Sequence, residues 1–333
     1  MKIGSWTSDQ SVLVVAEIGN NHEGDLTLAR DMIAAAAEAG ADAVKLQTLA
    51  PQTLVTADQQ TRRDQLARFA LGDDAWPELA DVARANDVMF LSTPFDLRAV
   101  HLLDPLVPAF KIASGDLTFA PLLRAVAATA KPVILSTGLA TDDEIAAAVA
   151  VLEKEWSAGE HPGLALLHCV SCYPTDAAQA SLRRIPALLR HSEIVGYSDH
   201  TLGVRAASVA VALGARIIEK HFTMDRNLSD FRDHQLSVDP PQMRELVAGI
   251  REAEALMADA AEVAQCEQDA RIAVRRSIAV GRDLAAGATI EASDLVWLRP
   301  ATGLPPGEES QVVGRRIVRD LGAGTLISAA DLA

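Results

Sequence analysis

The sequence predicts a (β/α)8 barrel followed by a small β-rich domain. Eight short apolar runs alternate with helical patterns over about the first 260 residues, a length and order typical of this barrel. Each apolar run ends in polar residues, as expected where parallel strands deliver side chains to one rim. From Arg276 to Ala333, short β-like runs alternate with glycine and proline turns, which indicates a separate domain.

The expected strands are Val12–Ile18, Ala43–Lys45, Val88–Leu91, Ala109–Ile112, Pro132–Leu135, Leu164–Leu167, Ile194–Tyr197 and Arg216–Glu219. Helices are expected between and after them, among others at Asp25–Ala39, Ala75–Asn86, Gly203–Leu213 and Pro240–Ala264. The alternative is an open doubly wound sheet, which usually carries a glycine-rich phosphate loop after its first strand. The segment EIGNNHEG at that place lacks the G-x-G-x-x-G spacing, and this favours the barrel.

These patterns divide the chain into a barrel domain at 1–264, a charged linker at 265–275 and a C-terminal domain at 276–333. The C-terminal domain contains two near-repeats, DLAAGATIEASDL and DLGAGTLISAADL. A β-rich domain of about 58 residues is marginally stable by itself. We therefore expect it to dock on a partner surface.

Composition excludes several classes of protein. The 333 residues carry a formal net charge of −15, which argues against nucleic acid and anionic membrane surfaces as partners. No apolar run reaches about 18 residues and the N-terminus lacks a signal-peptide core, so neither a membrane span nor secretion is expected. Three cysteines, an odd number, suit a reducing cytoplasm. Cys169 and Cys172 form a C-x-x-C after a buried-looking strand, and we assign it no redox or metal role.

Two histidines follow the last two expected strands. A parallel βαβ unit places the ends of both strands at the same edge, so His200 and His221 should lie side by side. Flanked by Asp199 and Glu219, the two imidazoles are candidates for a metal site with open positions. The alternative is a pair of unrelated loop histidines.

Polar residues capable of binding or catalysis follow all eight expected strands. They are Glu17, Lys45, Gln47, Thr93, Lys111, Ser114, Ser136, Tyr173, Ser198, His200, Glu219 and His221. Only 6 of the 30 basic residues are lysines. Three of these, Lys45, Lys111 and Lys220, lie at strand ends, which favours compact cations placed for an anion. Each serine or threonine alone is more typical of a turn or a helix cap, but the set favours a binding site.

At these residues the sequence resembles the sialic acid synthase family of the NeuB type, with an SAF (antifreeze-like) module at its C-terminal end. The matching segments are AEIGNNHEG, AVKLQT, FLSTPF, FKIASGD, KPVILSTG, LLHCVSCYPT, GYSDHT, IIEKHFT and VWLRPATG. The resemblance implies condensation of phosphoenolpyruvate with an N-acylated mannosamine-type aldose to a nine-carbon 2-keto sugar acid and phosphate. It also implies a divalent metal, usually manganese, with magnesium or cobalt as alternatives.

The resemblance further implies roles for individual residues. Phosphoenolpyruvate would be bound by Lys45, Thr93, Lys111, Ser114, Ser136 and Ser198, the metal by His200 and His221, and the sugar by Gln47, Tyr173, Glu219 and Asp233. Glu17 would orient or deprotonate the attacking water. An extra residue near Asp233 makes Asp230 an alternative sugar contact. Arg299 would reach the barrel of the neighbouring subunit in a domain-swapped homodimer, although a surface arginine is the alternative.

Two other functions stay open on the sequence. Another metal-dependent barrel aldolase or lyase would retain both histidines and make the lysine and serine set incidental. A non-catalytic carbohydrate-binding protein would use the SAF-like module as its recognition element. The acceptor also stays open, because the segment between Thr48 and Phe90 is shorter than in many relatives and Asp116 replaces their glutamate.

Overall fold

The computed structural model describes residues 1–157, 159, 161–258 and 262–333. These form two compact units, Met1–Met257 and Ala258–Ala333. Among the described residues, no helix combines the length and the apolar character that crossing a bilayer requires.

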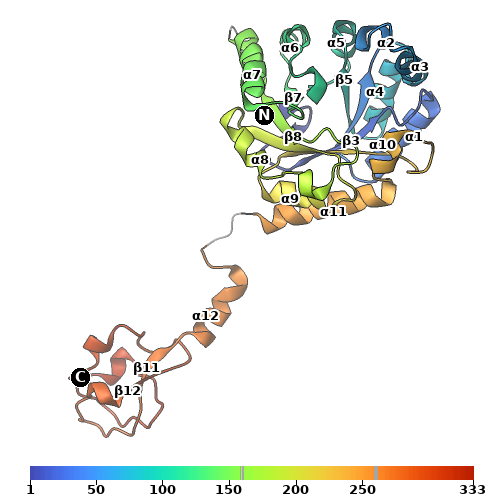
Figure 1. Cartoon of the computed structure of the whole chain (residues 1–333). Coiled ribbons are helices and arrows are strands. Elements are labelled where there is room, and N and C mark those ends of the chain that lie inside the picture. The colour runs from blue at the N-terminus through green and yellow to red at the C-terminus, as the bar shows by residue number, and fades with distance from the viewer. Residues whose placement is uncertain (158, 160, 259–261) are drawn as a thin grey trace. The chain divides into compact units, whose positions relative to one another are not determined.

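The first unit is a barrel of parallel strands (Figure 1). Its strands are β3 (Leu13–Gly19), β4 (Ala43–Thr48), β5 (Met89–Pro94), β6 (Phe110–Ile112), β7 (Val133–Ser136), β8 (Leu164–Cys169), β9 (Ile194–Asp199) and β10 (Ile217–His221). They are hydrogen-bonded in the order β5-β4-β3-β10-β9-β8-β7-β6. Strands β5 and β6, at the two ends of that order, also contact each other, which closes the ring. The predicted (β/α)8 barrel is confirmed.

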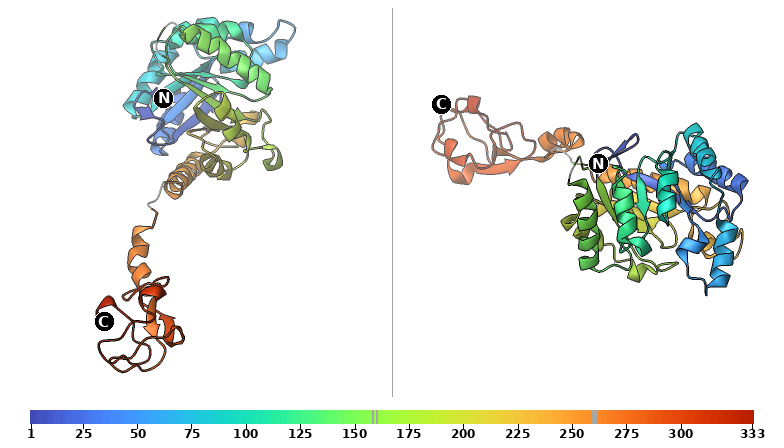
Figure 2. Two further views of the ribbon diagram at one scale, coloured as in Figure 1. Left: turned by 90° about the vertical axis from the view of Figure 1, so that its left-hand side faces the viewer. Right: turned by 90° about the horizontal axis from the view of Figure 1, so that it is seen from above.

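The helices surround the strands, as the further views in Figure 2 show. They are α1 (Leu26–Glu38), α2 (Pro51–Leu54), α3 (Gln60–Phe69), α4 (Ala75–Ala85), α5 (Leu97–Leu103), α6 (Ala120–Ala127), α7 (Asp142–Trp156), α8 (Arg184–Ala187), α9 (Arg205–Ala212), α10 (Arg232–Leu236) and α11 (Pro240–Leu256). Sequence signals fix several of their starts. Thr141 and Glu144 form a capping box at α7, and Asp239 with Gln242 forms another at α11.

Side chains alternate between the two sides of every strand, and this separates two cores. On β3, Leu13 and Val15 belong to a cluster inside the barrel, whereas Val14 and Ala16 pack in the outer layer against the helices. The interior cluster consists of Ile3, Trp6, Leu13, Val15, Ala43, Leu91, Ala109, Ile134, Ala165, Leu167 and Ile217. It fills the amino-terminal half of the barrel, so inward positions further along each strand are left for polar side chains.

The structure differs from the predicted elements in three places. A short hairpin of β1 (Lys2–Ile3) and β2 (Trp6–Thr7), which the sequence did not suggest, contributes apolar side chains to the interior cluster. The polar segment after Thr48, to which the sequence assigned no particular element, forms the helices α2 and α3. The long final helix ends at Leu256, short of the expected Ala264, and residues 259–261 of that expectation lie outside the described residues.

The second unit contains α12 (Gln268–Val274) and an antiparallel pair of β11 (Ser277–Val280) with β12 (Leu295–Leu298). The near-repeats of the sequence make equivalent contacts. Arg282 pairs with Asp294 at 2.6 Å in one repeat, and Arg319 pairs with Asp331 at 2.7 Å in the other. The two near-repeats also pair with each other through an isolated β-bridge between Leu284 and Leu321, and both contribute apolar side chains to one small core.

Asp199 does not belong to the site for which it was a candidate. Because Asp199 and Lys220 each directly precede a histidine, their side chains lie on the opposite side of the sheet. The Lys220 Nζ donates to Asp199 Oδ2 at 2.9 Å, and both side chains are fully buried. Lys220 is therefore a partner of Asp199 in the outer layer and not a cation for a bound anion.

Removal of one partner of this pair should destabilise the barrel strongly. In Asp199→Ala the Lys220 ammonium would keep its charge in a fully buried position, and we expect a loss of about 3–5 kcal/mol. Urea unfolding followed by circular dichroism measures this loss. The double variant Asp199→Leu/Lys220→Met should recover most of it, because no charge is then buried. A single variant within about 1 kcal/mol of the wild type would contradict this description of the pair.

Candidate active site

A pocket of about 290 Å³ opens at the carboxyl ends of the strands. Apart from Asp199, Lys220 and the alternative Asp230, its lining includes the site residues predicted in the barrel: Glu17, Lys45, Gln47, Thr93, Lys111, Ser114, Ser136, Tyr173, Ser198, His200, Glu219, His221 and Asp233. Arg299, in the second unit, is the one predicted site residue outside the barrel. The barrel therefore brings together, in one pocket, residues from the carboxyl ends of all eight strands and from the loops that follow them.

Two lysines and two glutamates form a charge cluster at the floor of this pocket. The Lys45 Nζ lies 3.0 Å from Glu17 Oε2 and 3.5 Å from Glu219 Oε2. The Lys111 Nζ lies 3.5 Å from Glu219 Oε1. All four side chains are buried, so each charge depends on the others for compensation. With two cations and two ionised carboxylates, the cluster has no net charge.

The two carboxyl groups of the cluster differ in the direction of their pKa shifts, because they have different neighbours. Burial alone would raise the pKa of Glu219, but the Lys111 and Lys45 ammonium groups and the Ser198 hydroxyl outweigh it and lower the pKa to about 2. Burial raises the pKa of Glu17 above its ordinary value of 4.5, because Lys45 offsets only part of that penalty and the Glu219 charge adds to it. Glu17 is thus the carboxylate of the cluster that is better suited to take up a proton.

Hydroxyl groups and a glycine line one side of the floor. Thr93 Oγ1 accepts from Lys45 Nζ at 3.1 Å, and Ser114 Oγ accepts from the Gly138 amide at 3.0 Å. A Cβ at Gly138 would approach the Ser171 Oγ to 2.5 Å and the Ser114 Oγ to 2.8 Å, so a larger residue there would displace both hydroxyl groups. The Ser136 Oγ is buried and has no hydrogen-bond partner among the described residues. Donors of this kind beside Lys111 are suited to an oxyanion ligand.

Glu17 is held in place by a chain of amide groups. The Gln47 Nε2 donates to Glu17 Oε1 at 2.8 Å, and the Asn20 Nδ2 donates to Gln47 Oε1 at 2.7 Å. Both polar atoms of the Gln47 side chain are therefore engaged, and one Glu17 oxygen faces Lys45 while the other faces Gln47. This arrangement fixes the orientation of the Glu17 carboxyl group within the pocket.

The two predicted histidines meet as expected, with ring centroids 5.3 Å apart. The His200 Nδ1 lies 2.8 Å from the Val170 carbonyl oxygen, which accepts the Nδ1 proton and leaves Nε2 with a free electron pair. Burial lowers the pKa of His221 well below its ordinary value, and the nearby His200 lowers it further. The His221 Nδ1 has no hydrogen-bond partner in the part of the chain that the structure describes. Burial would lower the pKa of His200 as well, but its contacts with the Cys169 sulfur and the Val170 carbonyl outweigh burial and raise that pKa. In their neutral forms the two imidazoles would suit a divalent metal ion.

The outer part of the pocket combines aromatic and charged groups. The Arg232 guanidinium lies 4.5 Å from the centre of the Tyr173 ring, and Tyr173 in turn stacks near His200 with centroids 4.1 Å apart. Asp233 is buried against this group and lines the pocket, whereas Asp230 lines a neighbouring one. Of the two aspartates that the sequence offered as alternative sugar contacts, Asp233 is therefore the one that lies in this pocket.

A model described as the NeuB family matches residues 32–262. The chain belongs to the NeuB family. A model of the SAF domain matches residues 275–333, so the predicted family resemblance is confirmed for both parts.

Relatives named as sugar acid synthases match this NeuB-family chain along most of its length. It is 38% identical to the N,N'-diacetyllegionaminic acid synthase of Legionella pneumophila, over 96% of this chain and 94% of that protein. It is 30% identical to the pseudaminic acid synthase of Campylobacter jejuni, over 99% of both. The crystal structure of an N-acetylneuraminic acid synthetase from Leptospira borgpetersenii superposes with a TM-score of 0.75 at 34% identity, covering 81% of this chain and 94% of that one. Since these relatives are named as sugar acid synthases, the chain is an enzyme of the same transferase type.

Sequence reasoning missed several pocket residues of this NeuB-family barrel. They are Asn20, Arg62, Leu66, Phe69, Phe95, Ala113, Gly115, Leu139, Cys169, Ser171, Phe231 and Arg232. For Asn20 and Cys169 a signal existed, since both lie in strand-exit segments and Cys169 has the inward parity of Leu167. For α3 and the Phe231 segment there was none, because their contact, with ring centroids of Phe69 and Phe231 4.7 Å apart, joins loops far apart in sequence.

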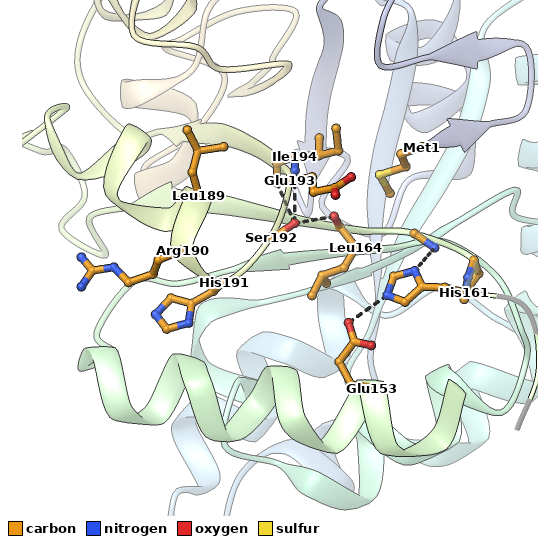
Figure 3. A pocket seen from close by; sticks show the side chains of 12 residues that line it. Met1, Glu153, His161, Leu164, Leu189, Arg190, His191, Ser192, Glu193 and Ile194 are labelled. Carbon is orange, nitrogen blue, oxygen red and sulfur yellow. Dashed lines mark hydrogen bonds and ion pairs between the residues drawn. The ribbon is translucent and has the colours of Figure 1, made fainter. Parts of the chain in front are cut away.

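A larger pocket of about 610 Å³ lies elsewhere on the barrel (Figure 3). It is lined by Leu164 and Ile194, which lie at the amino-terminal ends of β8 and β9. His161 in this pocket is paired with Glu153 at 2.8 Å. Among its described lining residues there is no lysine, and the Ser192 hydroxyl is already hydrogen-bonded to backbone carbonyl groups. We therefore take the smaller pocket, where lysines, carboxylates and hydroxyl groups converge, as the active site of this NeuB-family enzyme.

The cluster geometry predicts that Lys111 governs anion binding. In Lys111→Met an oxyanion would lose one of the two buried ammonium groups, and we expect inorganic phosphate to bind at least about tenfold more weakly. Isothermal titration calorimetry with phosphate measures the effect. The exposed Lys154→Met variant is the matched control and should bind as the wild type does. Equal phosphate affinity in wild type and Lys111→Met would show that the cluster is not an anion site.

Proposed function

We propose that the enzyme condenses phosphoenolpyruvate with an N-acylated mannosamine-type aldose to give a nine-carbon 2-keto sugar acid and phosphate. The observation that carries the proposal is the meeting of three groups in one buried pocket: the lysine cluster, the Glu17 carboxyl group and the two imidazoles. The names of the relatives support the class of product.

The donor is proposed to bind over the charge cluster. Phosphoenolpyruvate carries a carboxylate and a phosphate, and it needs cations and hydroxyl donors in fixed positions. The residues proposed to bind it are Lys45, Thr93, Lys111, Ser114, Ser136 and Ser198. The unpartnered Ser136 hydroxyl supports this proposal, because a buried donor without a protein acceptor is suited to a ligand oxygen.

His200 and His221 are proposed to hold a divalent metal ion, with manganese as the first candidate and magnesium or cobalt as alternatives. The fixed tautomer of His200 and the free His221 Nδ1 fit this role. No cluster of three or more His, Cys, Asp or Glu ligands exists within the described ranges, so water and substrate would complete the coordination. When bound, such an ion polarises the aldehyde oxygen of the acceptor.

The chain's own groups account for the remaining chemistry. The methylene carbon of the donor attacks the aldehyde carbon, the electrons of the C=O π bond move to the aldehyde oxygen, and this oxygen takes a proton from solvent to become a hydroxyl group. Positive charge then develops at the former enol carbon, where the nearby Glu17 and Glu219 carboxylates stabilise it. Glu17 takes a proton from the water that adds there. The resulting tetrahedral carbon expels phosphate by C–O cleavage and becomes the keto group, with its hydroxyl proton lost to the departing phosphate or solvent.

The acceptor is proposed to lie toward the outer part of the pocket. Its contacts there would come from Gln47, Tyr173, Glu219 and Asp233. Because Gln47 and Glu219 already bind Glu17 and the lysines, their role is to shape the reacting end, and Tyr173 and Asp233 face the rest of the sugar. Arg299 is proposed to complete the site in trans, from the SAF domain of the partner in a homodimer.

A panel of aldoses tests the proposed function directly. Phosphate release from phosphoenolpyruvate should require both an aldose and a divalent metal ion, and mass spectrometry should find the sum of the two carbon skeletons. Treatment with a chelator should abolish release, and added manganese should restore it. Metal-dependent cleavage of a keto acid without any use of phosphoenolpyruvate would instead indicate an aldolase or lyase.

Substitution of Glu17 tests its assigned role. Glu17→Gln keeps the size and the hydrogen bond from Gln47 but cannot accept a proton, so kcat should fall about 10²- to 10⁴-fold. In the wild type, kcat should decrease as falling pH protonates Glu17, and this decrease should begin above the ordinary glutamate pKa of 4.5. Steady-state kinetics across pH measures both effects. Undiminished turnover in Glu17→Gln would remove Glu17 from the mechanism.

A further inference from the structure

The acceptor end of the pocket depends on a very short helix. Helix α10 spans only Arg232–Leu236, yet it supplies both Arg232 and Asp233 to the pocket. A helix of this length is not stable by itself, because nucleation costs more than a single turn regains. It also lacks a side-chain cap at its N-terminus. Contacts from elsewhere in the fold must therefore hold it in place.

His234 provides these contacts from the side of α10 that faces away from the pocket. Its side chain is fully buried. The His234 Nδ1 shares a hydrogen bond of 2.7 Å with the Thr223 hydroxyl, just after β10. The His234 Nε2 donates to Glu23 Oε1 at 3.0 Å, since a carboxylate only accepts. Both ring nitrogens are thus committed to neighbouring segments of the barrel rim.

Glu23 occupies an unfavourable backbone conformation to make this contact. Its φ of 48° lies in the left-handed region, where a residue with a Cβ is strained by about 1–2 kcal/mol. Its carboxyl group also accepts from the Ser229 hydroxyl, at the start of the segment that leads into α10. One side chain therefore holds both Ser229 and His234, although Glu23 and His234 are 211 positions apart in the sequence.

We infer that Glu23 and His234 form a latch that positions α10 for acceptor binding. Neither residue lines the active-site pocket, so both are positioning residues and not catalytic ones. The inference rests on the proposed function, because it takes Asp233 as an acceptor contact. It assigns no effect on the donor, since Lys45 and Lys111 lie on β4 and β6, and neither latch residue is hydrogen-bonded to those strands.

Glu23→Gly is the most informative variant. It removes the carboxyl group and at the same time relieves the backbone strain, so the fold itself should not be weakened. We expect the KM for the acceptor to rise about tenfold or more, as for loss of a charged hydrogen bond. The KM for phosphoenolpyruvate and kcat should stay within about twofold, a split that general destabilisation does not produce. Glu23→Gln, which keeps an acceptor oxygen for His234, should restore much of the acceptor affinity.

Glu153→Ala is the matched control. It breaks a carboxylate–imidazole pair of similar length, that of Glu153 with His161 at 2.8 Å, beside the other pocket (Figure 3). Both KM values should equal those of the wild type. Hydrogen–deuterium exchange gives a readout that needs no turnover: amides of residues 229–237 should exchange faster in Glu23→Gly and unchanged in Glu153→Ala.

The outcomes separate the latch from the proposed function. An unchanged acceptor KM in Glu23→Gly, or equal rises for donor and acceptor, would overturn the latch. Unchanged exchange over 229–237 would overturn it as well. If the wild type releases no phosphate with any aldose, the proposed function fails, and the exchange comparison alone decides whether Glu23 holds α10.

Discussion

Compensation of buried charge is the constraint on which the pocket depends. Lys45 lies between Glu17 and Glu219, and Lys111 contacts Glu219, so the buried cluster is already neutral. A donor with a carboxylate and a phosphate would bring further negative charge into this neutral environment. The fold supplies uncharged donors for it, such as the Ser136 hydroxyl, and two imidazoles suited to a divalent cation. The same balance makes Glu17, and not Glu219, the carboxyl group that can exchange a proton.

The alternation of side chains along the strands explains what the sequence could reveal. Inward positions are apolar in the amino-terminal half of the barrel and polar at the carboxyl ends. The polar residues at the strand ends therefore revealed the charge cluster and the two histidines of the pocket, although Cys169 was missed. The same rule would have excluded Asp199 and Lys220. They were included because they are neighbours of His200 and His221 in sequence, yet adjacent residues on a strand face opposite sides.

The parts that the sequence did not reveal depend on contacts between distant loops. Leu66 and Phe69 reach the pocket from α3, whose sequence is polar and gives no apolar run. The contact of Phe69 with Phe231 and that of Glu23 with His234 each join segments that no local pattern connects. The loop lengths that bring them together follow from the assembled barrel and are not encoded by the periodicity of any one element.

The pocket residues on strands and those on loops are expected to affect the choice of substrate differently. The groups proposed to bind the donor and the metal lie on strands or directly after them, where the closed barrel fixes their positions. The groups at the acceptor end lie on α3 and α10, which are held by side-chain contacts between loops. Loop contacts change by substitution without disturbing the barrel. A single fold can thus retain one donor chemistry while different loops select different sugars, in agreement with relatives of 30–38% identity that are named for different sugar acids.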